Sequence, residues 1–216
     1  MNLAKLLQLA SPTLPVGAYS YSGGLEAAIE DGTVHDAGSA ERWIGDVLEF
    51  SVARLDAPLL LQFIEAFNQK DQKKIPILNE RLLASRETAE LRAETVQMGY
   101  SLCRLLEDVN VGELDIQEPS FPAAFAFAVS VWKIQPEAAL QAYLWSWLEN
   151  QVMAAVKSIT LGQTDGQKIL LALGNRIEEL VKEIVKTKDE DICNFTPGLA
   201  MLSSRHETQY SRLFRS

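Results

Sequence analysis

Few side chains in this sequence are of the types that carry nucleophilic or general acid–base catalysis. The only histidines are His35 and His206, and the only cysteines are Cys103 and Cys193. A serine elbow of the G-x-S-x-G type is absent, and no Ser–His–Asp or Cys–His pairing is indicated. His35 follows a Gly-Thr-Val turn, so we expect it in a solvated loop. The sequence does not predict a catalytic centre.

Metal ligands are equally sparse. The sequence contains no C-x-x-C pair, no H-E-x-x-H motif and no histidine-rich tract, which are the spacings of dedicated metal sites. Scattered glutamates, a lone histidine or a cysteine would bind a transition ion only weakly. We therefore predict no metal site and no cofactor within one chain. A site formed across a dimer axis cannot be predicted from one sequence.

The segment GQTDGQK, residues 162–168, has some features of a phosphate-binding loop. A P-loop needs G-x-x-x-x-G-K-[ST] after a strand, because its backbone N–H groups wrap the phosphates and its hydroxyl reaches magnesium. Here the spacing is G-x-x-x-G-x-K, Ile169 stands at the hydroxyl position, and a predicted helix precedes the segment. We interpret it as a tight turn between helices and expect no nucleotide hydrolysis.

The closing segment SSRHETQYSRLFRS, residues 203–216, differs in charge from the rest of the chain. From Pro197 onward there are three arginines against one acid, Glu207, which gives +2, while the whole chain carries −9 and the first 196 residues therefore −11. A pI near 4.8 makes nucleic acid a poor partner for the body. The basic tail is attracted either to its own body or to a separate acidic partner.

A second distinctive segment is SPTLPVGAYSYSGGLEAA, residues 11–28. Its prolines favour an extended approach, its paired glycines permit an unusual turn, and a short helix follows. Tyr19 and Tyr21 alternate with small residues. Two interpretations stay open: a loop pinned by buried tyrosines, or a surface on which a partner or the tail lays its backbone.

Helical periodicity runs through almost the whole sequence and defines the elements that position these segments. Apolar stripes predict helices after Ser39, which is expected to cap its helix, after Pro58 and over 91–106. The charged stretch RETAELRAE, residues 86–94, is expected on the outside of the third of these.

The helix after Pro136 is apolar around most of its girth over residues 140–159, which predicts a central place in the core. Thr164 and Gln167 match a capping box, and one further helix is expected to carry the inward-facing residues of 169–184.

The predicted fold is an all-α, single helical-bundle-like domain over residues 1–196 with a flexible C-terminal tail over 197–216. The stretch 109–120 is expected as a loop or a short extended piece. No inward stripe extends past Ile192, and a tail of this length buries too little apolar surface to offset its backbone entropy.

The apolar stretches APLLLQFI and AAFAFAVSVW are well short of the ~20 residues that span a bilayer. The N-terminal MNLAKLLQLASP has one lysine and no long apolar region, which argues against a secretory signal. Two cysteines suit a reducing compartment. We expect a soluble cytoplasmic protein with no membrane partner.

Four segments together resemble the UreF family of urease accessory proteins: LLQLASPTLPVGAYSYSGGLE, RETAELRAETVQMGYSL, LENQVMAAVKSITLGQTDGQ and PGLAMLSSRHETQYSRLFRS. The likeness extends over the chain from end to end, and the closing RHETQYSRLFRS is its most specific part. Many relatives have a histidine where this chain has Tyr21, so a metal-ligand role at that position is unsupported here.

The resemblance implies an all-helical, homodimer-forming protein with no reaction of its own. Such proteins join a second accessory protein, UreD or UreH, and recruit the GTPase UreG. The assembly delivers nickel to apo-urease, whose active-site lysine must also become carbamylated. In the family, the C-terminal segment is mobile in the free protein and becomes ordered when the UreD/UreH-type partner binds.

The candidate partner-binding residues follow from this resemblance. The arginines of the tail would supply permanently charged, directional donors, and its aromatic residues would supply apolar anchors. Lys157 matches a position of the family motif, although it otherwise resembles a solvated lysine. The full set is Tyr19, Glu26, Lys157, Arg205, His206, Glu207, Tyr210, Arg212, Phe214 and Arg215.

Two alternatives to a non-catalytic scaffold stay open. One is an enzyme whose site forms across a dimer axis. The scarcity of histidine argues against this alternative. The other is a free-standing helical regulatory protein whose tail binds its own body in cis.

Overall fold

The computed structural model describes residues 3–159 and 161–216, and over these residues the chain forms helices and loops without a strand. The predicted all-α fold is confirmed. Besides the α-helices there are the 3-10 helices η1 (Ala18–Ser20) and η3 (Asp189–Asp191) and the π-helix η2 (Leu48–Asp56). The α-helices are α1 (Leu3–Ala10), α2 (Leu25–Glu30), α3 (Ala37–Val47), α4 (Ala57–Gln69), α5 (Lys74–Ala84), α6 (Ala89–Asp108), α7 (Phe121–Val131), α8 (Pro136–Ser158), α9 (Gln163–Gly174), α10 (Ile177–Ile184) and α11 (Pro197–His206).

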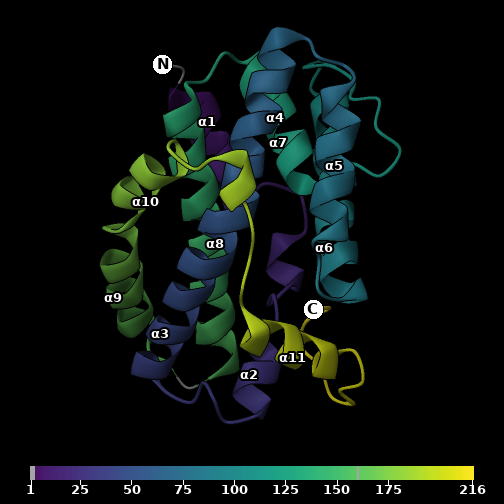
Figure 1. Cartoon of the computed structure of the whole chain (residues 1–216). Helices are drawn as coiled ribbons and strands as arrows, with labels where there is room; N and C mark the ends of the chain where they lie inside the picture. Colours follow the sequence, from purple (N-terminus) through teal and green to yellow (C-terminus); the bar gives the residue numbers. More distant parts are fainter. Residues whose placement is uncertain (1–2, 160) are drawn as a thin grey trace.

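Helix α8 runs through the middle of the molecule (Figure 1) and contacts α1, α2, α3, α4, α9 and α10. Pro136 occupies its first turn, where a missing N–H costs no intrahelical bond. Leu140, Leu144, Leu148 and Val152 are fully buried. The predicted central position of this helix is confirmed. Within the described ranges, no helix has both the length and the hydropathy needed to cross a membrane.

Helices α3 and α4 are joined through η2 without an intervening loop. The cap of α3 is Asp36, whose side chain accepts a hydrogen bond from the Ser39 amide at 2.7 Å. In return, the Ser39 hydroxyl accepts a hydrogen bond from the Asp36 amide at 3.0 Å. The predicted cap at Ser39 is therefore wrong, because this residue closes a capping box from inside the helix. The wider turns of a π-helix occur often at functional sites, and η2 ends at the buried Asp56.

Helix α7 packs between α4 and α6. Its start lies very close to α6, because a Cβ atom added at Gly99 would lie 1.9 Å from the carbonyl oxygen of Pro119. Only glycine allows this approach of two backbones. The stretch 109–120 that precedes α7 is a loop, which agrees with the prediction.

The sequence predicts one helix over residues 169–184, whereas the structure has two. Helix α9 ends at Gly174 and α10 begins at Ile177. The apolar period continues across the break, so periodicity alone does not reveal it. Glycine and asparagine are poor helix formers, and they stand together at the break as Gly174 and Asn175.

The segment 162–168 also differs from its interpretation. Gly162 is the N-cap of α9 without a side-chain cap, so the predicted capping box of Thr164 and Gln167 is wrong and most of the segment is helical rather than a turn. A Cβ atom at Gly166 would lie 2.9 Å from Val156. This glycine therefore allows α9 to approach α8 closely.

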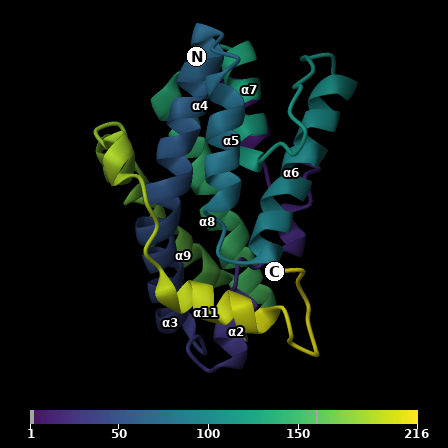
Figure 2. The ribbon, with the colours of Figure 1, turned by 45° about the vertical axis from the view of Figure 1, so that its right-hand side comes forward.

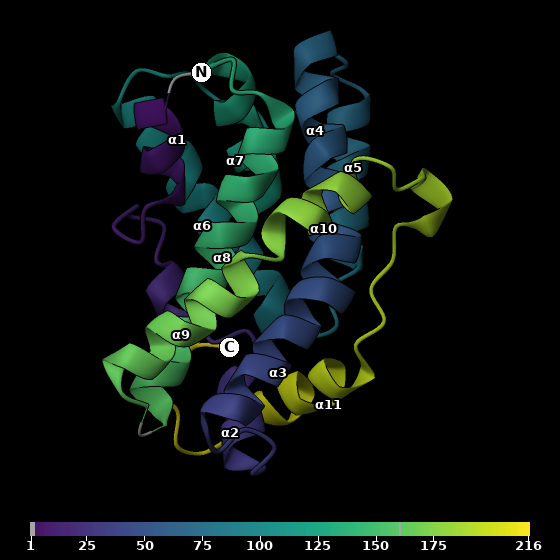
Figure 3. The same cartoon turned by 90° about the vertical axis from the view of Figure 1, so that its left-hand side faces the viewer.

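The C-terminal segment crosses one end of the helical body. The chain leaves α10 and runs along the outer side of the molecule (Figure 3) before α11 lies beside α2 (Figure 2). Leu199, Leu202 and Phe214 join the hydrophobic core. The expectation that no inward-facing residue lies beyond Ile192 is therefore wrong. Helix α11 presents an apolar side to α2. A Cβ atom added at Gly24, the N-cap of α2, would lie 2.8 Å from the side chain of Leu199.

Candidate partner-binding site

The two distinctive segments of the sequence lie side by side. The amide of Arg215 donates to the carbonyl of Ser20 at 2.9 Å, and the amide of Ser22 donates to the carbonyl of Ser216 at 3.0 Å. The Ser22 hydroxyl donates to the same carbonyl. Tyr21 between these serines is buried, and burial raises the pKa of its hydroxyl. Both interpretations of residues 11–28 therefore hold in part, because Tyr21 is buried and the tail lies along the loop.

One carboxylate holds the base of the tail. Glu26 of α2 is buried and accepts the backbone amides of Leu213 and Phe214 at 2.6 and 2.9 Å. It also contacts Nε2 of His206 at 3.2 Å. Because one side chain bonds three groups of the tail, residues 206 and 214 are brought together and the chain between them forms a loop. We call residues 207–213 the tail loop.

His206 is fully buried at the centre of this arrangement. Its second ring nitrogen, Nδ1, lies 2.6 Å from the carboxylate of Glu90 on α6, and Glu90 also accepts from Arg212 at 2.6 Å. Both ring nitrogens of the imidazole face carboxylates. A carboxylate only accepts, so a ring nitrogen can hydrogen-bond to it only when that nitrogen carries a hydrogen. The ring thus links α2, α6 and α11.

Glu207 and Arg205 attach the tail to the surface of the body. The carboxylate of Glu207 accepts the amides of Ala89 and Glu90, the first two residues of α6, at 2.9 and 3.3 Å. An acid at a helix N-terminus satisfies free N–H groups and interacts favourably with the helix dipole. Arg205 pairs with Asp31 at 2.7 Å.

The tail loop leaves its outer side chains free of the body. Tyr210 is fully exposed, and Leu213 and Met201 of α11 are mostly exposed. Phe214, by contrast, is buried and serves the protein's own core. The two aromatic residues of the tail therefore differ, because Tyr210 is available as an anchor for a partner and Phe214 anchors the tail itself.

Two further candidates lie together at a different place. The ammonium of Lys157 is 5.9 Å from the centre of the Tyr19 ring, within reach of a cation–π interaction. Both residues are exposed. The structure brings together Lys157 and Tyr19, and separately Glu26 with the residues of the tail.

We call the body residues that contact residues 197–216 the tail site. Among them, Ser22, Asp31, Glu90 and Glu94 were not predicted. Glu94 accepts from the Ser216 hydroxyl at 2.6 Å, and burial raises the pKa of its carboxyl. The expectation that the charges of residues 86–94 all lie outside is wrong. Glu90 and Glu94 are one helical turn apart and so share a face, a spacing that would have marked them as a pair.

In the described part of the chain, no three His, Cys, Asp or Glu side chains gather closely enough to hold a metal ion. His35 is exposed in a loop, as predicted.

Comparison with known proteins identifies the family of this chain. The sequence profile of the UreF family matches residues 34–174. The chain belongs to the UreF family. It is 54% identical to the urease accessory protein UreF of Azoarcus sp. (strain BH72), over the whole of this chain and 96% of the relative. The UreF proteins of Dechloromonas aromatica and Janthinobacterium sp. are 50% and 49% identical, over 100% and 99% of this chain and 98% of each relative.

Family membership extends to the ends of the chain. The profile stops at residue 174, but the alignments with these UreF relatives cover the segments that form the tail site. The resemblance noted in the sequence is thus confirmed at the level of the family.

Proposed function

We propose that this UreF-family protein is a non-catalytic, cytoplasmic scaffold for urease maturation. In this role it dimerises, joins a UreD/UreH-type accessory protein through residues 197–216, and recruits a UreG-type GTPase, and the assembly delivers nickel to apo-urease. The match to urease accessory proteins over the full chain supports the pathway.

The observation that carries the docking role is the shape of the tail loop. Its base is fixed by Glu26, His206 and Glu90, whereas Tyr210 and Leu213 face solvent. A loop that is already ordered loses less conformational entropy on binding. Exposed tyrosine is among the residues that contribute most to binding energy at interfaces.

The test is a pull-down with the UreD/UreH-type protein of the same organism, followed by a urease activation assay. We expect the double variant Tyr210→Ala, Leu213→Ala to lose partner binding and activation while melting at the wild-type temperature. The matched control is Leu171→Ala, an equally exposed leucine on α9. Unchanged binding by the double variant would contradict the docking role.

A second candidate is the regulatory protein whose tail acts in cis, since the base of the tail loop is bonded to its own body. Limited proteolysis separates the two. A scaffold gains protection of residues 207–213 when the partner is added, whereas a purely cis-acting tail shows the same protection with and without it.

A further inference from the structure

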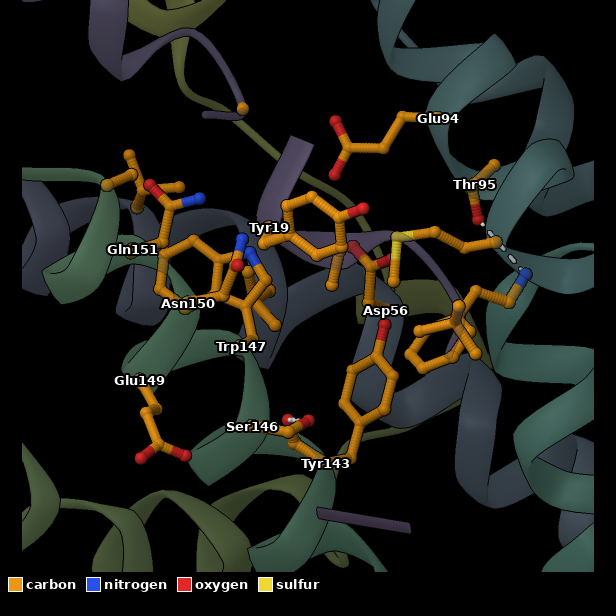
Figure 4. A pocket seen from close by; sticks show the side chains of 18 of the residues that line it. Tyr19, Asp56, Glu94, Thr95, Tyr143, Ser146, Trp147, Glu149, Asn150 and Gln151 are labelled. Carbon is orange, nitrogen blue, oxygen red and sulfur yellow. Dashed lines mark hydrogen bonds between the residues drawn. The ribbon is translucent and has the colours of Figure 1, made fainter. Parts of the chain in front are cut away.

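A cavity of about 280 Å³ lies between α6, α8, η2 and the N-terminal loop (Figure 4). Its walls are largely apolar and include Leu9, Val52, Met98 and Phe121. Leu199 of α11 completes one side. Mostly apolar cavities with a few convergent polar groups are typical of small-molecule sites.

The polar groups of the cavity are buried and incompletely bonded. Asp56 and Arg86 form an ion pair in which their side chains are 6% and 13% exposed. The Nε atom of Arg86 is buried without a hydrogen-bond partner. Tyr143 is 5% exposed, and its hydroxyl points into the cavity toward Asp56 (Figure 4). Each unpaired buried polar group costs stability.

The charges around the cavity restrict what can enter it. Burial raises the pKa of Tyr143 well above its ordinary value, so the hydroxyl stays a neutral donor. Burial also raises the pKa of the carboxyl groups of Glu87 and Glu94. The cavity lining carries charges of both signs. A cation would meet Arg86 and Lys157, and an anion would meet Asp56, Glu87, Glu94 and Glu149.

We propose that this cavity binds a small uncharged molecule that carries a hydrogen-bond acceptor on an otherwise apolar body. The acceptor pairs with the Tyr143 hydroxyl and Nε–H of Arg86, and the apolar body packs against Met98 and Phe121. The site is independent of the proposed scaffold role, because it rests on residues outside the tail loop.

Occupancy of the cavity is linked to docking of the tail. Leu199 forms part of the wall, and the Ser216 hydroxyl donates to Glu94, which also lines the cavity. A ligand that contacts the cavity only when this wall is in place stabilises the docked tail by its differential affinity.

The test compares benzamide, which has a carbonyl acceptor, with toluene, which is similar in shape and has none. Binding is followed by NMR of protein with ¹³C-labelled methionine methyl groups. Met98 and Met153 line the cavity, and Met201 lies outside it on α11. We expect benzamide to shift the Met98 and Met153 signals saturably, with little change at Met201, and to bind more tightly than toluene.

The variant Tyr143→Phe should weaken benzamide binding about three- to tenfold, which corresponds to one hydrogen bond, and leave toluene binding unchanged. Hydrogen exchange at residues 213–216 should slow with benzamide in the wild type. Equal affinity of the two probes would overturn the proposal in favour of a merely apolar cavity. Absence of saturable shifts would overturn it in favour of a cavity filled by water. Both outcomes are read from the wild type, so they do not depend on the folding of the variant.

Discussion

At the scale of single residues, the ring of His206 joins Glu26 of α2 to Glu90 of α6. Replacing it by alanine leaves Glu26 and Glu90 facing each other without the imidazole between them. We expect His206→Ala to cost about 1–3 kcal/mol of tail docking, as for other buried groups left without a partner, and to speed hydrogen exchange of the Leu213 and Phe214 amides. The control is Thr208→Ala in the exposed loop. Continued protection of both amides would show that Glu26 holds the tail without the ring.

The buried pair of Asp56 and Arg86 predicts a large effect on global stability. Asp56→Asn removes one charge and leaves the other buried, which costs about 3–5 kcal/mol. The exposed pair of Arg92 and Glu118 is the matched comparison, and Glu118→Gln should cost less than about 1 kcal/mol. Urea unfolding of both variants measures the difference. Similar midpoints would indicate that water reaches Arg86 and compensates its charge.

Glu94 predicts a pH-dependent effect. Burial raises its folded-state pKa above the ordinary 4.5, so the favourable contribution of the protonated carboxyl is present below the unfolded pKa and is lost as the pH rises through the folded pKa. Glu94→Gln should therefore raise the melting temperature at pH 7, by an amount that shrinks as the pH falls toward 4.5.

Glu178→Gln is the control, because its expected change in melting temperature has the opposite sign. The hydrogen bond from Lys182 lowers the pKa of Glu178, so this substitution should slightly lower the melting temperature at pH 7 and have no effect in acid. A Glu94→Gln variant that behaves like Glu178→Gln would contradict the burial of the Glu94 carboxyl.

At the scale of elements, the crossing of α6 and the start of α7 depends on one missing side chain. Gly99→Ala improves helix propensity but places a methyl group against the backbone at Pro119. We expect a net loss of about 1–3 kcal/mol, as for other overpacked sites. Gln97→Ala, exposed two residues earlier in the same helix, should be neutral or stabilising in the same thermal melts. A stable Gly99→Ala protein would mean that α7 shifts without cost.

Much of this architecture could be predicted because helices leave a local signal. Apolar periodicity indicated the central α8, and Pro136 marked its start. The break between α9 and α10 was missed because the apolar period continues through it. The cap at Asp36 was missed because Ser39 is an equally suitable cap by residue type.

The tail site could be predicted only in part, because its contacts join distant parts of the chain. Glu26 and His206 are separated by 180 residues, and no periodicity reports such a pairing. The residue types of the tail indicated that it binds something, and the acidic balance of the body allowed the body itself as the target. The identity of the acids, Glu26 and Glu90, required the fold.

At the scale of the whole molecule, the proposed scaffold role includes a two-fold dimer. We expect sedimentation to give about twice the chain mass of 24.0 kDa at micromolar concentration, since most soluble oligomers are symmetric homodimers. A chain that stays at the monomer mass over that range, both alone and with its UreD/UreH-type partner, would contradict the dimer.

The hydrogen bond between Ser22 and Ser216 can form only after the whole chain between them has been synthesised. These residues are 194 positions apart, so at about 5–20 residues per second, ribosomes make them roughly 10–40 s apart. During that interval Ser22 and Glu26 have emerged without their partners, and the cavity lacks Leu199. A protein that meets the nascent chain then finds Ser22 and Glu26 not yet covered by the tail. A partner that binds during translation therefore meets a different surface from one that binds the finished chain. The rate of translation sets how long the earlier kind of binding is possible.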